Sequence, residues 1–241
     1  MKKFNLKRGI VAIGAVIVMM FSASASAQET EESVNKFEVS VGADLVSNYI
    51  WRGQNLGAAS VQPSIGISYA GLSFGTWGST SFDGSSTEID WTLGYEVAGF
   101  YVGVTTYYNT GEFFDWKSDA STNLLEANLS YTLPESFPLT ISANTMLTGV
   151  LDKNADDNQN FSTYAELSYP FSVSSVDMSV AVGMVLGESA YYITDGFSIY
   201  NITVGASKSI KITDDYSMAV FSSVTLNPVT EGTYLSFGVS F

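Results

Sequence analysis

The stretch Tyr234-Leu235-Ser236-Phe237-Gly238-Val239-Ser240-Phe241 closes the chain and decides the fold. Apolar side chains alternate along it with small or polar ones, which is the period of a β-strand with two different faces. Its apolar face would carry Leu235, Phe237, Val239 and Phe241. Since the same alternation recurs back to residue 37, the sequence predicts an all-β protein.

Period-2 alternation predicts twelve strands. They are 37–52, 60–69, 72–79, 86–97, 99–108, 123–133, 138–149, 161–170, 175–186, 197–209, 214–226 and 233–241. Tight connections at 70–71, 98–99 and 134–138 alternate with longer polar ones at 53–59, 109–122, 150–160 and 187–196. An even strand number with short periplasmic turns and long extracellular loops is typical of a transmembrane antiparallel up-and-down β-barrel. A break in parity at Thr76-Trp77-Gly78 predicts a bulge there and leaves the count between 10 and 14.

The first 27 residues have the three parts of a signal peptide. Four basic residues precede the apolar run from Gly9 to Phe21, and Ala25-Ser26-Ala27 forms a small-residue cleavage site. The run is too short for a membrane-anchor helix. We therefore expect a cleaved signal peptide over 1–27, a disordered acidic periplasmic lead-in over 28–36 and a barrel over 37–241.

Charge and composition exclude several function classes. Cleavage would leave 24 acidic against 6 basic residues, a net charge of −18 instead of −14, which argues against nucleic acid as a partner. The chain has no Cys and no His, so it lacks disulfides, thiolate or imidazole metal ligands and histidine-dependent catalytic triads. We expect no enzyme activity and no cofactor.

Asp152–Asn158 begins like a calcium loop, but Asp157 and Thr163 stand where Gly and Glu are required, so a solvated acidic loop without metal is expected.

Acidic residues within the predicted strands all fall on the face opposite the apolar one. A charge that faces lipid is costly, whereas one that faces a lumen stays hydrated. A soluble β-sandwich would segregate charge in the same way, so this pattern alone establishes a two-faced sheet. In a barrel, the residues predicted to line the pore are Asp44, Arg52, Glu88, Asp90, Glu96, Glu126, Glu166 and Asp177.

Aromatic residues favour the membrane over the sandwich, because lipid-embedded barrels carry aromatic girdles at both interfaces. One girdle would comprise Tyr69, Tyr95, Tyr131, Tyr169 and Phe241, and the opposite one Tyr49, Trp51, Trp91 and Phe161. The alternative is that tyrosines are simply favourable strand residues.

Several segments resemble a known family. Asp44–Gly53, Gly71–Ser79, Glu88-Ile89-Asp90 and Gly94-Tyr95 are similar to the TorF-type porins of bacterial outer membranes, over about residues 42–108. The second half matches only in strand rhythm and final Phe. The resemblance implies an outer-membrane barrel with passive transport, and no particular substrate.

Arg52 is predicted near the extracellular end of the first strand, where Glu88 and Asp90 of the fourth strand could meet it across the lumen. Two interpretations stay open: a charged constriction that acts on passing solutes, or a structural ion-pair network that fills the lumen. The excess of acids predicts cation preference in any open pore. The aromatic loop 109–122 could fold inward as a plug or present a contact surface outward.

The sequence therefore predicts a porin-like outer-membrane channel for passive diffusion of small solutes, with a closed or plugged barrel of structural or adhesive role as the alternative. Expected partners are outer-membrane lipid and lipopolysaccharide, small solutes, and the barrel-assembly machinery, which would read the C-terminal strand. The oligomeric state stays undecided.

Overall fold

A computed structural model describes residues 36–109, 114–116 and 122–241. The expected signal peptide and most of the expected lead-in lie outside these ranges. Twelve long strands make up the wall: β1 (Glu38–Val46), β4 (Ser60–Tyr69), β5 (Leu72–Ser81), β6 (Thr87–Val97), β7 (Phe100–Tyr108), β8 (Leu124–Thr132), β9 (Thr140–Thr148), β10 (Thr163–Val173), β11 (Val176–Val185), β14 (Ser198–Lys211), β15 (Ser217–Asn227) and β16 (Gly232–Ser240). The shorter elements are β2 (Tyr49–Trp51), β3 (Gln54–Gly57), the 3₁₀ turn η2 (Val150–Asp152), β12 (Glu188–Ser189) and β13 (Thr194–Asp195). In the described part of the chain, no helix is long and apolar enough to span a membrane.

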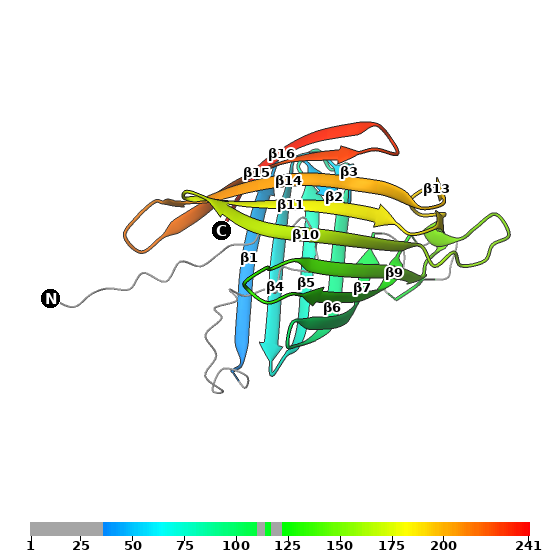
Figure 1. The fold of residues 1–241 in the computed structure, drawn as a ribbon, viewed down its shortest axis with the longest axis horizontal. Helices are drawn as coiled ribbons and strands as arrows, with labels where there is room; N and C mark the ends of the chain where they lie inside the picture. The colour runs from blue at the N-terminus through cyan, green and yellow to red at the C-terminus, as the bar shows by residue number, and fades with distance from the viewer. Residues whose placement is uncertain (1–35, 110–113, 117–121) are drawn as a thin grey trace.

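The twelve long strands form one closed antiparallel barrel in which each strand pairs with its neighbours along the chain. Strands β10, β11 and β14 cross in front of β1, β4 and β5 (Figure 1), as tilted strands on opposite walls do. Strand β1 pairs with β4 along its whole length, but with β16 only through Asp44–Val46. Closure thus depends on a short seam.

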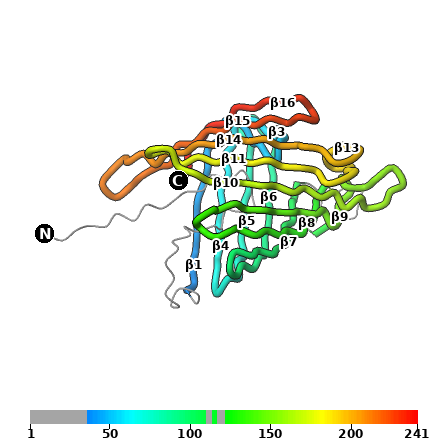
Figure 2. The backbone as a smooth tube through the Cα atoms, viewed as in Figure 1, coloured from blue at the N-terminus to red at the C-terminus, as the bar shows by residue number. Residues whose placement is uncertain are grey.

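The two ends of the barrel differ. The β14–β15 turn, orange in Figure 2, projects at the end where the C-terminus lies, and the connection after β9, yellow-green, projects at the opposite end. We name these the terminal end and the loop end. Turns at the terminal end are tight: Ala70-Gly71 and Ala98-Gly99 both have positive φ at two successive residues. This is the turn whose twist matches that of a β-hairpin.

Side chains alternate between an apolar outer face and a polar lumen. Val41, Leu235 and Phe237 are 76%, 65% and 62% exposed on the outside, whereas Thr105, Asn128 and many other polar residues are buried inside. An apolar outer face of this kind would promote aggregation in water, whereas it is favourable in the hydrocarbon of a membrane. The fold is therefore the predicted transmembrane β-barrel, and its strand number is twelve.

Two sequence expectations about the wall were wrong. The first strand does not continue to residue 52, because the chain leaves the wall after Val46 and forms the β2–β3 hairpin. No bulge interrupts β5, whose register with β6 is continuous from Leu72 to Thr80. Trp77 keeps the strand parity and simply faces inward, where its ring lies 5.2 Å from that of Tyr49.

Gly238 offers a test of the seam. A Cβ atom there would lie 2.4 Å from the Leu45 carbonyl oxygen and 2.6 Å from the Phe221 ring. We expect Gly238→Val to destabilise the barrel by about 2 kcal/mol, the usual size of an overpacking effect, and to lower the folded fraction on heat-modifiability gels. Gly187→Val is the matched control, since nothing lies within 4 Å of a Cβ at that position. Equal folding of both variants would contradict the seam.

Candidate functional site

The β2–β3 hairpin folds into the barrel lumen. Its two strands pair through Tyr49–Trp51 and Gln54–Gly57, and its turn residues Arg52 and Gly53 have φ of 47° and 81°. At Gly53 a Cβ would come within 2.5 Å of the Tyr200 carbonyl oxygen, so only glycine allows the tip to approach β14. The Asn227 side chain on β15 donates a hydrogen bond of 3.1 Å to the Gly53 carbonyl. The hairpin thus reaches from β1 to strands on a different part of the wall.

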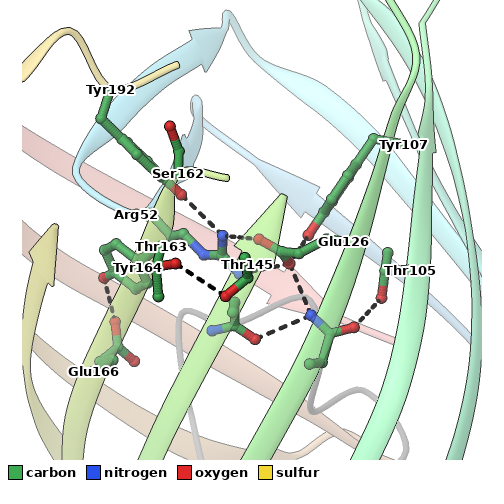
Figure 3. A network of polar contacts seen from close by, with 12 residues as sticks. Arg52, Thr105, Tyr107, Glu126, Thr145, Ser162, Thr163, Tyr164, Glu166 and Tyr192 are labelled. Carbon is green, nitrogen blue, oxygen red and sulfur yellow. Dashed lines mark hydrogen bonds and ion pairs between the residues drawn. The ribbon is translucent and has the colours of Figure 1, made fainter. Parts of the chain in front are cut away.

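Arg52 is the centre of the lumen contacts. Its Nη1 and Nη2 atoms donate to the two carboxylate oxygens of Glu126, at 2.6 and 2.9 Å. Nη1 also donates to the Tyr192 hydroxyl at 2.9 Å. The guanidinium carbon lies 4.4 Å from the Trp51 ring centroid and 4.7 Å from that of Tyr164. Figure 3 shows Arg52 of the hairpin with Glu126 and Tyr164 of the wall and Tyr192 of a loop around it.

The ion pair is removed from water, since Arg52 and Glu126 are 1% and 0% exposed. Burial is the largest single influence on the pKa of Arg52 and lowers it, but Glu126 together with Tyr192 and Tyr107 outweighs burial and holds that pKa well above its usual value. Burial also raises the pKa of Tyr192, so its hydroxyl stays neutral and accepts from Arg52. A bidentate pair in this setting is both strong and directional.

Hydrogen bonds continue from Glu126 along the wall. Its Oε2 accepts from the Tyr107 hydroxyl and from the Asn128 amide, both at 2.8 Å. Asn128 in turn bonds to Asn144 on β9 and accepts from Thr105 on β7 (Figure 3). A hairpin held in this way crosses the lumen at a fixed level.

A second group of contacts lies around Glu166. Its carboxylate accepts from the Tyr164 hydroxyl at 2.6 Å and from the Asn201 amide at 3.3 Å. Tyr164 stacks with Tyr192, and Tyr192 packs edge-on against Tyr200. Tyr200 points inward because the β11–β14 register shifts beside it. Aromatic rings therefore fill the space between Arg52 and β14.

The expected meeting of Arg52 with Glu88 and Asp90 was wrong. Arg52 lies at the tip of the hairpin instead of the top of β1, and its partner is Glu126. In the described part of the chain, no basic side chain forms an ion pair with Glu88 or Asp90.

The other residues predicted to line the pore lie on inward-facing strand positions, at two levels. Asp90, Glu126 and Glu166 are buried in the loop half of the barrel, and Glu88 is half-buried there. Asp44 is half-buried opposite Gln62 and Ser240, and Asp177 is half-buried toward the terminal end, where Glu96 is exposed. Among the predicted pore residues, Arg52 contacts Glu126, and the carboxyl group of Glu88 contacts that of Asp90.

The predicted girdle positions are divided. Tyr49 and Trp51 are 5% and 4% exposed inside the lumen, so their assignment to a girdle was wrong. The remaining residues are exposed or half-buried: Tyr69, Trp91, Tyr95, Tyr131, Phe161, Tyr169 and Phe241. Their position at a lipid headgroup level stays a prediction.

Loop 109–122 lies partly outside the described residues, but Phe114–Trp116 are described. Trp116 Nε1 donates to the hydroxyl of Thr106, which lies on the outer face of β7, between the inward-facing Thr105 and Tyr107. This part of the loop therefore lies against the outside of the wall and does not fold inward as a plug.

The calcium-like loop is not simply a solvated acidic loop. Asp152 is fully buried and accepts hydrogen bonds from Ser162 and from the Gln159 amide, so it has a structural role. Within the described ranges, no cluster of His, Cys, Asp and Glu side chains could hold a metal ion.

Comparison with known proteins gives similarity at the level of solved structures alone. No family model and no curated protein matches the chain. An outer membrane channel from Pseudomonas putida F1 is 12% identical with a TM-score of 0.43, over 88% of this chain and 98% of that one. Salmonella typhi OmpF in complex with daunomycin is 11% identical with a TM-score of 0.41, over 89% and 99%. Pseudomonas aeruginosa OprD is 13% identical with a TM-score of 0.36, over 85% and 66%.

At these identities and TM-scores, the similarities do not indicate function, and the fold rests on the strand pairing itself. The resemblance to the TorF-type porins stays a prediction. Several residues of the lumen were not found from the sequence, above all Gly53, Tyr107, Tyr164, Tyr192 and Asn201. The dipeptide Arg52-Gly53 between two short alternating segments was the available signal for the hairpin turn.

The buried ion pair predicts a large effect of Arg52→Met. The substitution leaves the Glu126 carboxylate buried without a counter-charge, which costs about 3–5 kcal/mol. We expect this loss in the free energy of unfolding, measured by urea titration in lipid vesicles, and partial recovery in the double variant Arg52→Met/Glu126→Gln.

Lys211→Met is the control, since it removes an equally short pair with Asp214 whose side chains are 65% and 95% exposed. Exposed pairs contribute little. If Arg52→Met and Lys211→Met had the same small effect, the pair would not hold the hairpin.

Proposed function

We propose that the protein is an outer-membrane channel for the passive diffusion of small cations, in which the β2–β3 hairpin restricts the lumen. The charge balance inside the barrel carries this proposal. In the loop half of the lumen, Arg52 is the one basic group among the described residues. Its charge is neutralised by Glu126. Glu88, Asp90 and Glu166 remain on inward positions without an ionic partner.

The membrane assignment rests on the outer face. Its apolar side chains are exposed in every part of the wall. The pairing of β1 with β16 closes the sheet on itself, so neither strand is a free edge in the hydrocarbon. We include in the proposal contacts with outer-membrane lipid and lipopolysaccharide, and assembly through the last strand.

The restriction to small cations rests on the distribution of side chains along the lumen. At the hairpin level, Trp51, Arg52 and Tyr192 are almost completely buried. Toward the terminal end, many inward positions carry small polar residues that remain partly accessible. These include Ser64, Ser68, Ser130, Ser142 and Ser168. The hairpin level is therefore the narrow part of the path, and inorganic cations suit it better than large solutes.

A second candidate function is a plugged barrel with a structural or adhesive role. The complete burial of the Arg52–Glu126 pair favours it, because a lumen in steady conduction hydrates its charges. In this case the wild-type protein would not conduct at all.

The test replaces residues 48–58 by Asn-Gly. Val46 and Ser60 are cross-strand partners, so Ser47 and Ala59 would face each other and a two-residue turn can join them. Ser47 is kept because it bonds to Phe237 across the seam. In planar bilayers with a potassium chloride gradient, we expect small cation-selective steps from the wild type and a several-fold larger conductance, still cation-selective, from the variant.

The matched control replaces residues 154–158 by Asn-Gly in the loop that the Lys153–Gln159 bridge closes. This control should conduct like the wild type. Anion selectivity of the wild type, or a folded variant that conducts no better, would contradict the proposal. A silent wild type with a conducting variant would support the plugged alternative.

A further inference from the structure

A recess lies at the loop end, between the hairpin and the wall. It has a volume of about 280 Å³ and is lined by Tyr49 and Trp51 of the hairpin, Glu88 of β6, Tyr107 of β7 and Tyr191 of the loop before β13. The Trp51 ring meets those of Tyr107 and Tyr191 edge-on, at 5.6 and 5.9 Å between centroids. Four aromatic rings and one carboxylate thus surround one cavity.

Two neighbouring carboxyl groups at this recess have no basic partner among the described residues. Glu88 accepts a long hydrogen bond, 3.4 Å, from the Tyr49 hydroxyl, and its carboxyl group also contacts that of Asp90. Asp90 follows it on the inward face of β6, is 1% exposed, and apart from the Glu88 carboxyl has no hydrogen-bond partner among the described residues. Two carboxyl groups in contact repel each other when both are ionised, and a cation bound beside them relieves this repulsion.

We propose that this recess binds a small organic ammonium ion. Aromatic faces attract cations, most strongly where water is excluded, and Glu88 with Asp90 behind it adds the opposite charge. The carboxylates would neutralise the ammonium group, and the rings of Tyr49, Trp51 and Tyr191 would contact its alkyl substituents.

Other ligands fit less well. A metal ion requires a denser set of ligands, and the described residues contain no such cluster. An anion would be repelled by both carboxylates. An uncharged solute could contact the rings but would leave Asp90 and Glu88 uncompensated.

The inference does not depend on conduction, so it can fail independently of the channel proposal. The probe is choline, whose uncharged isostere 3,3-dimethyl-1-butanol has the same shape. Calorimetric titration of the refolded protein in detergent at pH 8 should show one choline site and much weaker binding of the alcohol.

Two variants identify the recess. Glu88→Gln should weaken choline binding by about tenfold, and Tyr191→Leu should weaken it several-fold through the loss of one aromatic face. The matched controls are Glu188→Gln and Phe197→Leu, which change an exposed acid and an exposed ring near the same end of the barrel. Both controls should bind choline like the wild type.

Three results would overturn the inference: no choline binding, equal binding of choline and the alcohol, or unchanged affinity in Glu88→Gln and Tyr191→Leu. Because Tyr191 lies in a loop, Tyr191→Leu remains informative if Glu88→Gln does not fold. A barrel that binds choline without conducting would contradict only the channel proposal, and one that conducts without binding would contradict only this inference.

Discussion

The ion pair between Arg52 and Glu126 determines how the lumen is organised. A guanidinium and a carboxylate that are both withdrawn from water are stable only together, so each holds the other in place. Since Arg52 lies at the tip of the β2–β3 hairpin and Glu126 on β8, this mutual dependence fixes the hairpin across the barrel. The level at which the lumen is narrow follows from that one contact.

The rest of the loop half of the lumen is adapted to the hairpin. Gly53 leaves room for the β14 backbone, and a register shift turns Tyr200 inward. On β5 the large side chain of Trp77 faces inward and contacts Tyr49 of the hairpin. Toward the terminal end, where no hairpin enters, serine and glycine are frequent on the inner face. In the loop half, large inward side chains thus pack against the hairpin.

Strand alternation predicted the wall well because lipid outside and polar side chains inside impose the same period on every strand. It failed between residues 47 and 59 for the same reason: Tyr49 and Trp51 alternate in a hairpin as they would in a wall strand. What distinguishes the two cases is a distant partner, Glu126, which local periodicity cannot identify. The apolar residue at an inward position, Trp77, was a genuine signal, but it marked an aromatic contact inside the lumen and not the predicted bulge.

The most direct test uses the absence of cysteine from the chain. A single cysteine is introduced at Gln54 in the hairpin or at the exposed Ser85, and its reaction rate with a bulky, membrane-impermeant maleimide is measured in lipid vesicles. If the ion pair holds the hairpin inside, the cysteine at position 54 reacts much more slowly than that at 85, and Arg52→Met removes this protection while Lys211→Met does not. Equal rates at both positions, or protection that survives Arg52→Met, would contradict the account.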